Sequence, residues 1–274
     1  MKITSILENT KQDRKLTAKH GLSLYIETDQ MNIIFDTGPD GSYIKNAKAM
    51  GIDLSKAHAV VISHGHSDHI GGLSYLNEVN KEAQIYLSEH SLEPHWLRLG
   101  GYYHKVGAKK DIQHSFKDRL NFVAKDMEIA KGIHIITLNP ANEYTKNLYK
   151  GSKKELDDFN HEIMLVIENK NGIVLFSGCS HHGIIDMANI ALDKFPGKKI
   201  DVIIGGFHLI GIPIINTLGK SKDEIISIGN SLNEMPINSI YSCHCTGAKG
   251  YKILDSVLKE KLNPFPTGKE LIIS

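Results

Sequence analysis

Hydrophobic positions along this chain follow two kinds of spacing, and the change between them outlines the fold. Short apolar runs with strand-like alternation dominate the first part, whereas the later part alternates apolar runs with segments of helical spacing. The predicted strands are 3–7, 21–27, 32–35, 59–62, 84–88, 133–138, 163–168, 173–177, 200–204, 239–242 and 270–273. The predicted helices are 41–50, 184–195, 222–235 and 251–262. Both halves place strands before strand–helix units, which predicts an α/β protein (α+β type) built as an αβ/βα four-layer sandwich, with two sheets face to face and helices outside.

One stretch, residues 89–131, breaks this rhythm. Its segment 93–99 has helical spacing, but the residues after it lack a clear period, and the stretch carries the single tryptophan and two adjacent tyrosines. We predict one domain over 1–274 with an insertion at 89–131, and we interpret the insertion as a lid over the functional site. A surface subdomain that packs its aromatic side chains on the core is the alternative. Residues 139–160 are polar and predict a loop with at most a short helix.

The most specific chemistry lies in the motif HxHxDH, which directly follows the apolar run 59–62. In an extended chain His64 and His66 point to the same side, and Asp68 and His69 follow at the start of a helix. Imidazole nitrogens and carboxylate oxygens suit zinc, manganese or iron, and these ligands are too many for one closed site built locally. A solvent-exposed loop rich in histidine is the alternative, but the strand–turn–helix context favours a metal site.

Further candidates stand just past apolar runs, where a fold can hold them in place. A thiolate at Cys179 could bind a thiophilic metal such as zinc; a small buried hydrophobic residue is the alternative. His208 follows two glycines that allow close backbone approach, and it could act as a general acid or hold an oxyanion, unless it is a core histidine with satisfied hydrogen bonds. Cys243 and Cys245 flank His244 and, in an extended segment, point away from it, which predicts core residues rather than ligands.

These motifs resemble the metallo-β-lactamase superfamily, whose signatures include HxHxDH and a first-strand sequence similar to NIIFDTG at 32–38. The sequences FSGCSH, GGFH and SCHCTG, at 176–181, 205–208 and 242–247, resemble one branch, which includes a dihydropterin-aminobenzene-phosphate synthase of methanopterin biosynthesis and uncharacterised bacterial relatives. The metal ligands implied by this resemblance are His64, His66, Asp68, His69, Cys179, His244 and one of His161 and His181. The carboxylate of Asp36 would support the site without binding metal. Cys179 departs from the superfamily pattern, which has an aspartate that bridges two metals at this position.

The resemblance implies two divalent transition metal ions, zinc or else manganese or iron, and a small-molecule substrate. The first hypothesis is a metallohydrolase that activates water against a small, phosphorylated or cyclic substrate, with Asp68, His181 and His208 as catalytic residues. The second hypothesis is a pterin-pathway synthase that condenses a dihydropterin with an aminobenzene ribosyl phosphate. The third is a non-catalytic metal-binding protein with a redox or nucleic-acid-binding role.

Charge and cysteine content narrow the partners and the compartment. With 32 basic and 31 acidic side chains the net charge is +1, so we expect neither nucleic acid nor an acidic membrane as a partner. The 3 cysteines form no CxxC pair, which favours a reducing, cytoplasmic setting. The chain begins without a signal-peptide pattern, and no apolar run approaches the length of a membrane span. The sequence predicts no particular oligomeric state.

Overall fold

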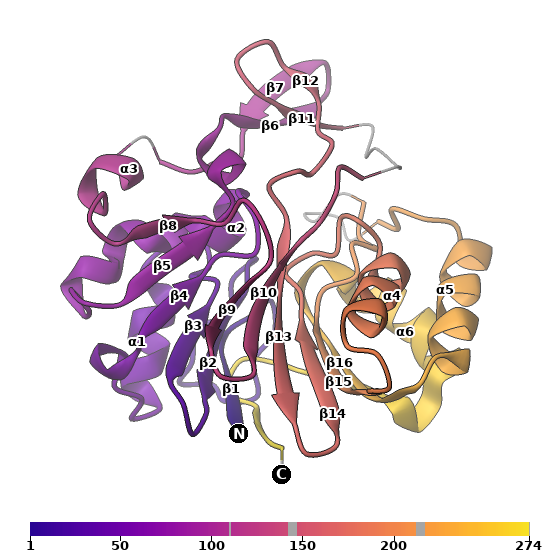
Figure 1. The fold of residues 1–274 in the computed structure, drawn as a ribbon. Helices are drawn as coiled ribbons and strands as arrows, with labels where there is room; N and C mark the ends of the chain where they lie inside the picture. Colours follow the sequence, from indigo (N-terminus) through magenta and orange to yellow (C-terminus); the bar gives the residue numbers. More distant parts are fainter. Residues whose placement is uncertain (110, 142–146, 212–216, 274) are drawn as a thin grey trace.

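Two seven-stranded sheets pack face to face, and helices cover their outer surfaces (Figure 1). The computed structural model describes residues 1–109, 111–141, 147–211 and 217–273. In spatial order the first sheet contains β18 (Glu270–Ile272), β1 (Lys2–Leu7), β2 (Ser23–Glu27), β3 (Asn32–Phe35), β4 (Ala59–Val61), β5 (Gln84–Leu87) and β8 (Leu120–Phe122). The second contains β17 (Leu262–Pro264), β16 (Ile237–Ser242), β15 (Ile200–Gly205), β14 (Gly172–Phe176), β13 (Ile163–Asn169), β10 (Ile133–Thr137) and β9 (Met127–Ala130). The αβ/βα sandwich predicted from the sequence is confirmed.

Alternate residues of the strands fill the space between the two sheets. In β3, Ile33 and Phe35 point into this central core, whereas Ile34 joins the outer cluster that packs under α1 (Ser42–Ala49). In β13, Leu165 lies in the central core and Val166 lies on the outer side, where the helices α4 (Ile184–Lys194), α5 (Lys222–Glu234) and α6 (Gly247–Leu258) cover the sheet. Strands covered on both faces are apolar at nearly every position, and this is why the sequence shows continuous apolar runs.

Both sheets contain a parallel section whose strands all end at one edge. β3, β4, β5 and β8 pair in parallel in the first sheet, and β14, β15, β16 and β17 do so in the second. The loops that follow these strands carry the histidine-rich motifs of the sequence. This edge of the sandwich is therefore where the candidate ligands meet.

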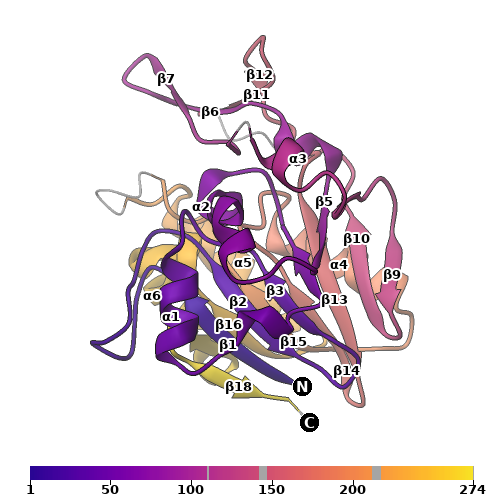
Figure 2. The same cartoon turned by 90° about the vertical axis from the view of Figure 1, so that its left-hand side faces the viewer.

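A third, four-stranded sheet stands beyond that edge (Figures 1 and 2). Its order is β12 (Glu155–Leu156), β11 (Leu148–Lys150), β6 (His95–Leu99) and β7 (Tyr102–Lys105). The prediction of a helix at 93–99 is wrong, because this segment forms strand β6 between β7 and the distant β11. The loop predicted at 139–160 contains β11 and β12. In so short a segment the apolar spacing fits a helix and a strand equally well, and the pairing partner decides.

The predicted insertion at 89–131 divides between the small sheet and the sandwich. Its first part builds β6 and β7, whereas its second part supplies the short helix α3 (Ile112–Ser115) and the strands β8 and β9 of the main sheets. The small sheet is fastened to the HxHxDH motif, since the backbone N–H of Ser67 donates to the carbonyl oxygen of Val106 at 2.6 Å. Within the described ranges, no helix is both long and apolar enough to cross a bilayer.

Candidate metal centre

The candidate ligands lie in the loops that follow the parallel strands. His64 and His66 follow β4, and Asp68 and His69 stand in the short helix α2 (Ser67–Ile70) just behind them. The second sheet contributes Cys179 and His181 after β14, His208 after β15 and His244 after β16. Because all these strands end at one edge, His69 comes into contact with His244, which lies 175 positions later in the chain.

Four side chains form a group that we call the Asp68 group: Asp68, His69, Cys179 and His244. Nε2 of His69 is 3.1 Å from Nε2 of His244, 3.2 Å from Sγ of Cys179 and 3.8 Å from Oδ2 of Asp68. Nε2 of His244 is also 3.2 Å from Oδ2 of Asp68. Ligand atoms around a tetrahedral zinc ion, with bonds of about 2.0–2.1 Å, are about 3.3 Å apart. The group therefore has the spacing of a site for one such ion.

His69 and His244 each use Nδ1 in a hydrogen bond, and this leaves a lone pair on the Nε2 atoms that face each other. Nδ1 of His69 donates to Oδ2 of Asp36 at 2.6 Å, and Nδ1 of His244 donates to Oδ1 of Asn9 at 3.0 Å. In the neutral rings both Nε2 atoms then carry lone pairs, which repel at 3.1 Å unless a proton or a metal ion lies between them. Burial opposes a charge on His244, but the hydrogen bond to Asp68 raises its pKa to about 9. The carboxylate that favours a proton here would equally favour a metal cation.

A second group, which we call the His64 group, consists of His64, Cys179 and His181. Ser63 Oγ donates to Oδ2 of Asp36 at 2.7 Å, so it accepts the hydrogen of His64 Nδ1 at 2.8 Å and leaves the lone pair on Nε2. That Nε2 and both ring nitrogens of His181 are buried and have no hydrogen-bond partner in the described part of the chain. Buried polar atoms are rarely left in this state, so the arrangement fits a bound ion that accepts imidazole and thiolate ligands, as zinc does.

Cys179 belongs to both groups, so one sulfur atom faces both candidate ion positions. Burial raises the pKa of the Cys179 thiol, and a bound metal would reverse that shift because the thiolate is the ligating form. Gly178 before it has no room for a side chain: an added Cβ would lie 2.1 Å from Oγ of Ser63 and 3.0 Å from Nδ1 of His64. This glycine allows the two sheets to bring their loops together.

Asp36 connects the two groups through hydrogen bonds behind their histidine rings. This fully buried carboxylate contacts His69 directly and His64 through Ser63, whose backbone N–H also donates to Oδ1 of Asp36 at 2.7 Å. The backbone of Asp36 has φ 58°, and His208 and His244 are also left-handed, at φ 47° and 49°. Such conformations are unfavourable for residues other than glycine, and they concentrate at functional sites.

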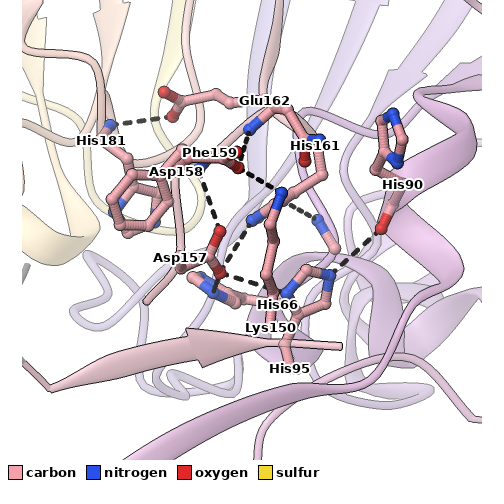
Figure 3. Close-up of polar contacts among 12 residues, drawn as sticks. His66, His90, His95, Lys150, Asp157, Asp158, Phe159, His161, Glu162 and His181 are labelled. Atoms are coloured by element: carbon pink, nitrogen blue, oxygen red, sulfur yellow. Dashed lines mark hydrogen bonds and ion pairs between the residues drawn. The ribbon is translucent and has the colours of Figure 1, made fainter. Parts of the chain in front are cut away.

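His161, one of the two alternatives for the third histidine, uses its ring nitrogens in hydrogen bonds (Figure 3). The backbone N–H of Gly65 donates to Nδ1 of His161 at 3.0 Å, so the ring hydrogen sits on Nε2, which is 3.2 Å from Oδ2 of Asp157. Burial lowers the pKa of His161 to about 3, which keeps the ring neutral. Neither nitrogen therefore has a lone pair to spare, in contrast to His181.

His208 stands beside these groups and is partly exposed. Its Nδ1 has no hydrogen-bond partner among the described residues, and its ring lies 4.3 Å from that of His181. The prediction that Cys245 points away from the site is wrong: His244–Thr246 is a 3₁₀ turn rather than an extended segment, and Sγ of Cys245 approaches Cys179 and His208. Cys243 packs in the core between the sheets, as predicted.

Sequence reasoning missed several polar residues that hold the ligands in place. Glu8 accepts a hydrogen bond from the backbone N–H of His244 at 2.7 Å, and Glu162 accepts those of His181 and His182 at 2.9 and 3.0 Å. Glu8 and Glu162 had a sequence signal, since one directly follows the predicted strand 3–7 and the other directly precedes an apolar run. The residues missed in this way are Glu8, Asn9, His95, Asp157 and Glu162.

Comparison with known proteins gives consistent matches along the chain. A family model described as the metallo-beta-lactamase superfamily matches residues 16–197. The chain is 29% identical over 273 residues to the 7,8-dihydropterin-6-methyl-4-(beta-D-ribofuranosyl)-aminobenzene-5'-phosphate synthase of Methanocaldococcus jannaschii. The aligned region covers 92% of this chain and 89% of that protein. An uncharacterized protein of the same organism, MJ0448, is 28% identical over 258 residues, or 90% of this chain and 91% of its own length. The solved structure of Tm1679, described as a metal-dependent hydrolase of the beta-lactamase superfamily, has a TM-score of 0.83 at 29% identity and covers 100% of this chain and 99% of its own.

Proposed function

This chain belongs to the metallo-β-lactamase superfamily, and from that premise we propose that it is a metal-dependent hydrolase with two divalent ions, one in each ligand group. The observation that carries the proposal is that the Asp68 group and the His64 group share Cys179, while Nε2 of His64 and both ring nitrogens of His181 have no hydrogen-bond partner in the described part of the chain. Imidazole, thiolate and carboxylate together suit zinc, with manganese or iron as alternatives.

The proposed ligands divide between the two ions as follows: Asp68, His69, Cys179 and His244 for one, and His64, His66, Cys179 and His181 for the other. His161 is left out because Gly65 donates to its Nδ1. This choice makes His181 the third histidine. The shared Cys179 would occupy the position where most members of the superfamily have a bridging aspartate.

When bound, the two ions would supply an activated water at neutral pH and a positive charge for a carbonyl or phosphoryl oxygen of the substrate. Asp36 keeps His64 and His69 in the tautomers that present Nε2 to the centre. Asp68, whose side chain is 22% exposed, is the ligand open to solvent and would orient the attacking water. His208 is the proposed proton donor to the leaving group, because its unpaired Nδ1 lies beside His181 at the partly exposed side.

The small sheet supports a small, phosphorylated substrate and a role as a lid. Nζ of Lys154 lies 4.8 Å from the ring centre of Trp96 and 4.4 Å from that of Tyr103, and the guanidinium of Arg98 lies 5.8 Å from the Tyr103 ring. Cations and aromatic rings beside the strand ends suit an anionic group and a ring of a substrate. A cyclic substrate such as a lactone would use the same rings.

The second candidate function is that of a synthase which condenses a dihydropterin with an aminobenzene ribosyl phosphate. Its support is the similarity to the synthase of Methanocaldococcus jannaschii, which extends over 92% of this chain. Both functions would need the same metal centre. They differ in whether water or a second substrate attacks.

Metal analysis combined with a substrate screen tests the proposal. We expect one to two equivalents of transition metal per chain, a lower content in Asp68→Ala, which loses a ligand of one ion, and an unchanged content in the control His114→Ala, on the surface helix α3. Phosphodiesters, lactones and the pterin-condensation substrates would then be assayed with the same preparations. Turnover of the condensation pair alone would favour the synthase. A wild-type chain that cannot be loaded with metal would rule out both functions.

A further inference from the structure

A cluster of three histidines around one carboxylate lies next to the metal centre. This Asp157 cluster consists of His66, His95, Asp157 and His161 (Figure 3). His95, Asp157 and His161 are fully buried, and His66 is 6% exposed. Oδ2 of Asp157 is 3.2 Å from Nδ1 of His95, 3.2 Å from Nε2 of His161 and 3.8 Å from Nε2 of His66. One carboxylate oxygen is therefore shared by three imidazole rings.

The hydrogen bonds of the cluster engage the ring nitrogens of His95 and His161. The hydrogen of His161 sits on Nε2, because the backbone of Gly65 donates to Nδ1. In His95, Nδ1 faces the carboxylate at 3.2 Å and Nε2 faces the carbonyl oxygen of His90 at 3.3 Å, so both ring nitrogens point at hydrogen-bond acceptors. Burial opposes ionisation, yet the hydrogen bonds from the rings hold the pKa of Asp157 far below its usual range.

His66 is the member that connects this cluster to the metal centre. Its Nε2 faces Asp157 and has no hydrogen-bond partner within the described ranges, and a small rotation of the ring would close the 3.8 Å gap to a hydrogen bond. Its ring stands edge-on to those of His64 and His181, with centroids 4.8 and 4.9 Å away. With the hydrogen of His66 on Nε2, its lone pair is on Nδ1 and is free for a metal ion.

The cluster also stands where the small sheet leaves the sandwich. His95 is the first residue of β6, and Asp157 follows directly after β12. A Cβ added to Gly65, which lies between His64 and His66, would be 2.6 Å from Nε2 of His95. The metal motif and the start of β6 are therefore in close packing contact. The small sheet and the metal motif are thus joined through these same side chains.

We propose that Asp157, held in place by His95 and His161, is a positioning residue that orients His66 as a metal ligand. This inference rests on the proposed function, since it requires an ion in the His64 group. Carboxylates behind ligating histidines fix the ring tautomer and orientation, and their loss costs about 10- to 100-fold in metal affinity. Asp157 does not contact the ion, and its effect is confined to the site that includes His66.

The test compares Asp157→Asn with the neighbouring Asp158→Asn. The amide keeps an oxygen for the backbone N–H of Phe159, which donates to Oδ1 of Asp157 at 2.9 Å, but removes the charge. Asp158 is the matched control, because its carboxylate pairs with Lys150 and faces no histidine of the cluster. Dissociation constants of both metal equivalents would be measured by competition with a chromogenic chelator, together with the absorption spectrum of the cobalt-loaded protein and the melting temperature without metal.

We expect Asp157→Asn to weaken one equivalent about 10- to 100-fold, to leave the other within about threefold, and to shift the cobalt spectrum, while Asp158→Asn changes none of these. A melting temperature that falls while both dissociation constants stay within threefold would overturn the proposal, because the role would then be structural only. If Asp157→Asn does not fold, His95→Gln decides by the same criteria, with the exposed His104→Gln as its control. A wild-type chain that binds no metal would instead overturn the proposed function, and this inference with it.

Discussion

The Asp68 group and the His64 group use similar side chains but differ in how their ligand atoms are satisfied. In the Asp68 group, the nitrogens of His69 and His244 face each other at 3.1 Å, and the carboxylate and the sulfur complete the set. In the His64 group, Nε2 of His64 and both ring nitrogens of His181 contact no partner among the described residues. The ligand atoms of the first group thus contact one another, whereas those of the second remain unpaired, beside a His208 ring that lies 4.3 Å from the His181 ring. Unpaired buried ligand atoms are the stronger sign of a bound ion.

The carboxylate of Asp36 does not explain this difference, because it supports histidines of both groups. Asp36 contacts the histidine of one group directly and that of the other through Ser63. The contrast comes instead from the second sheet, which contributes His244 to one group and His181 to the other from different loops. Four predictions would break or sharpen this comparison, and their expected effects decrease in the order given below.

Asp36→Ala is expected to have the largest effect, because it removes the partner that orients His64 and His69 in both groups. We expect the affinity for each ion to fall about 10- to 100-fold and kcat/KM to fall at least as far. Metal stoichiometry after gel filtration and steady-state kinetics measure this. Asp40→Ala is the control, since Asp40 pairs with Lys19 near the surface. Loss of metal from one group alone would mean that the two groups are supported independently.

His244→Ala and His181→Ala should each weaken the binding of one ion, and of a different one, so that one equivalent of cobalt fills mainly the other group. His244 belongs only to the Asp68 group and His181 only to the His64 group, so each change leaves the other ligand set complete. Cobalt-loaded variants should therefore show two distinct absorption spectra whose sum approximates that of the wild type. If either variant loses both ions together, the division into two separate groups is wrong.

Changes at Cys179 should weaken both sites without emptying either, because three ligands remain in each. Cys179→Asp replaces the soft thiolate with a harder oxygen, so we expect the preference to move from zinc towards manganese. In the wild type, bound metal should protect the thiol from alkylation. Metal competition and alkylation rates with and without metal provide the measurements. An alkylation rate that is indifferent to metal, with full occupancy in Cys179→Ala, would reduce Cys179 to a packing residue.

Tyr103→Ala in the small sheet should have the smallest effect on the centre and act on substrate binding alone. The ring lies against Lys154 and 5.1 Å from the Tyr149 ring, so its loss disturbs the aromatic surface of the proposed lid but not the ligands. We expect KM to rise by about threefold to tenfold, with metal content and kcat nearly unchanged. The neighbouring His104→Ala, on the opposite face of β7, should leave KM unchanged. Identical kinetics in both variants would make the small sheet a bystander.

Local patterns in the sequence were sufficient to predict the sandwich and to identify the HxHxDH motif at its edge. The continuous apolar runs mark strands covered on both faces, and HxHxDH directly after one of them places His64, His66, Asp68 and His69 within a single loop. Each of these inferences depends on residues only a few positions apart. The strands predicted at 163–168 and 173–177 are confirmed for the same reason, and they pair antiparallel as β13 and β14.

Tertiary structure alone decided which polar residues support that motif. Asp157 meets His95 across 62 positions, and Asn9 meets His244 across 235, and no local spacing encodes either contact. The same holds for strand β6, whose pairing with β11 overrides its helix-like spacing, and for Cys245, which a 3₁₀ turn rotates toward the centre. His161 and His181 differ in their partners: the backbone of Gly65 donates to Nδ1 of His161 and its Nε2 faces Asp157, whereas neither ring nitrogen of His181 has a partner among the described residues. A sequence shows which residue types are present, but hydrogen bonds to distant partners determine which nitrogen keeps a free lone pair.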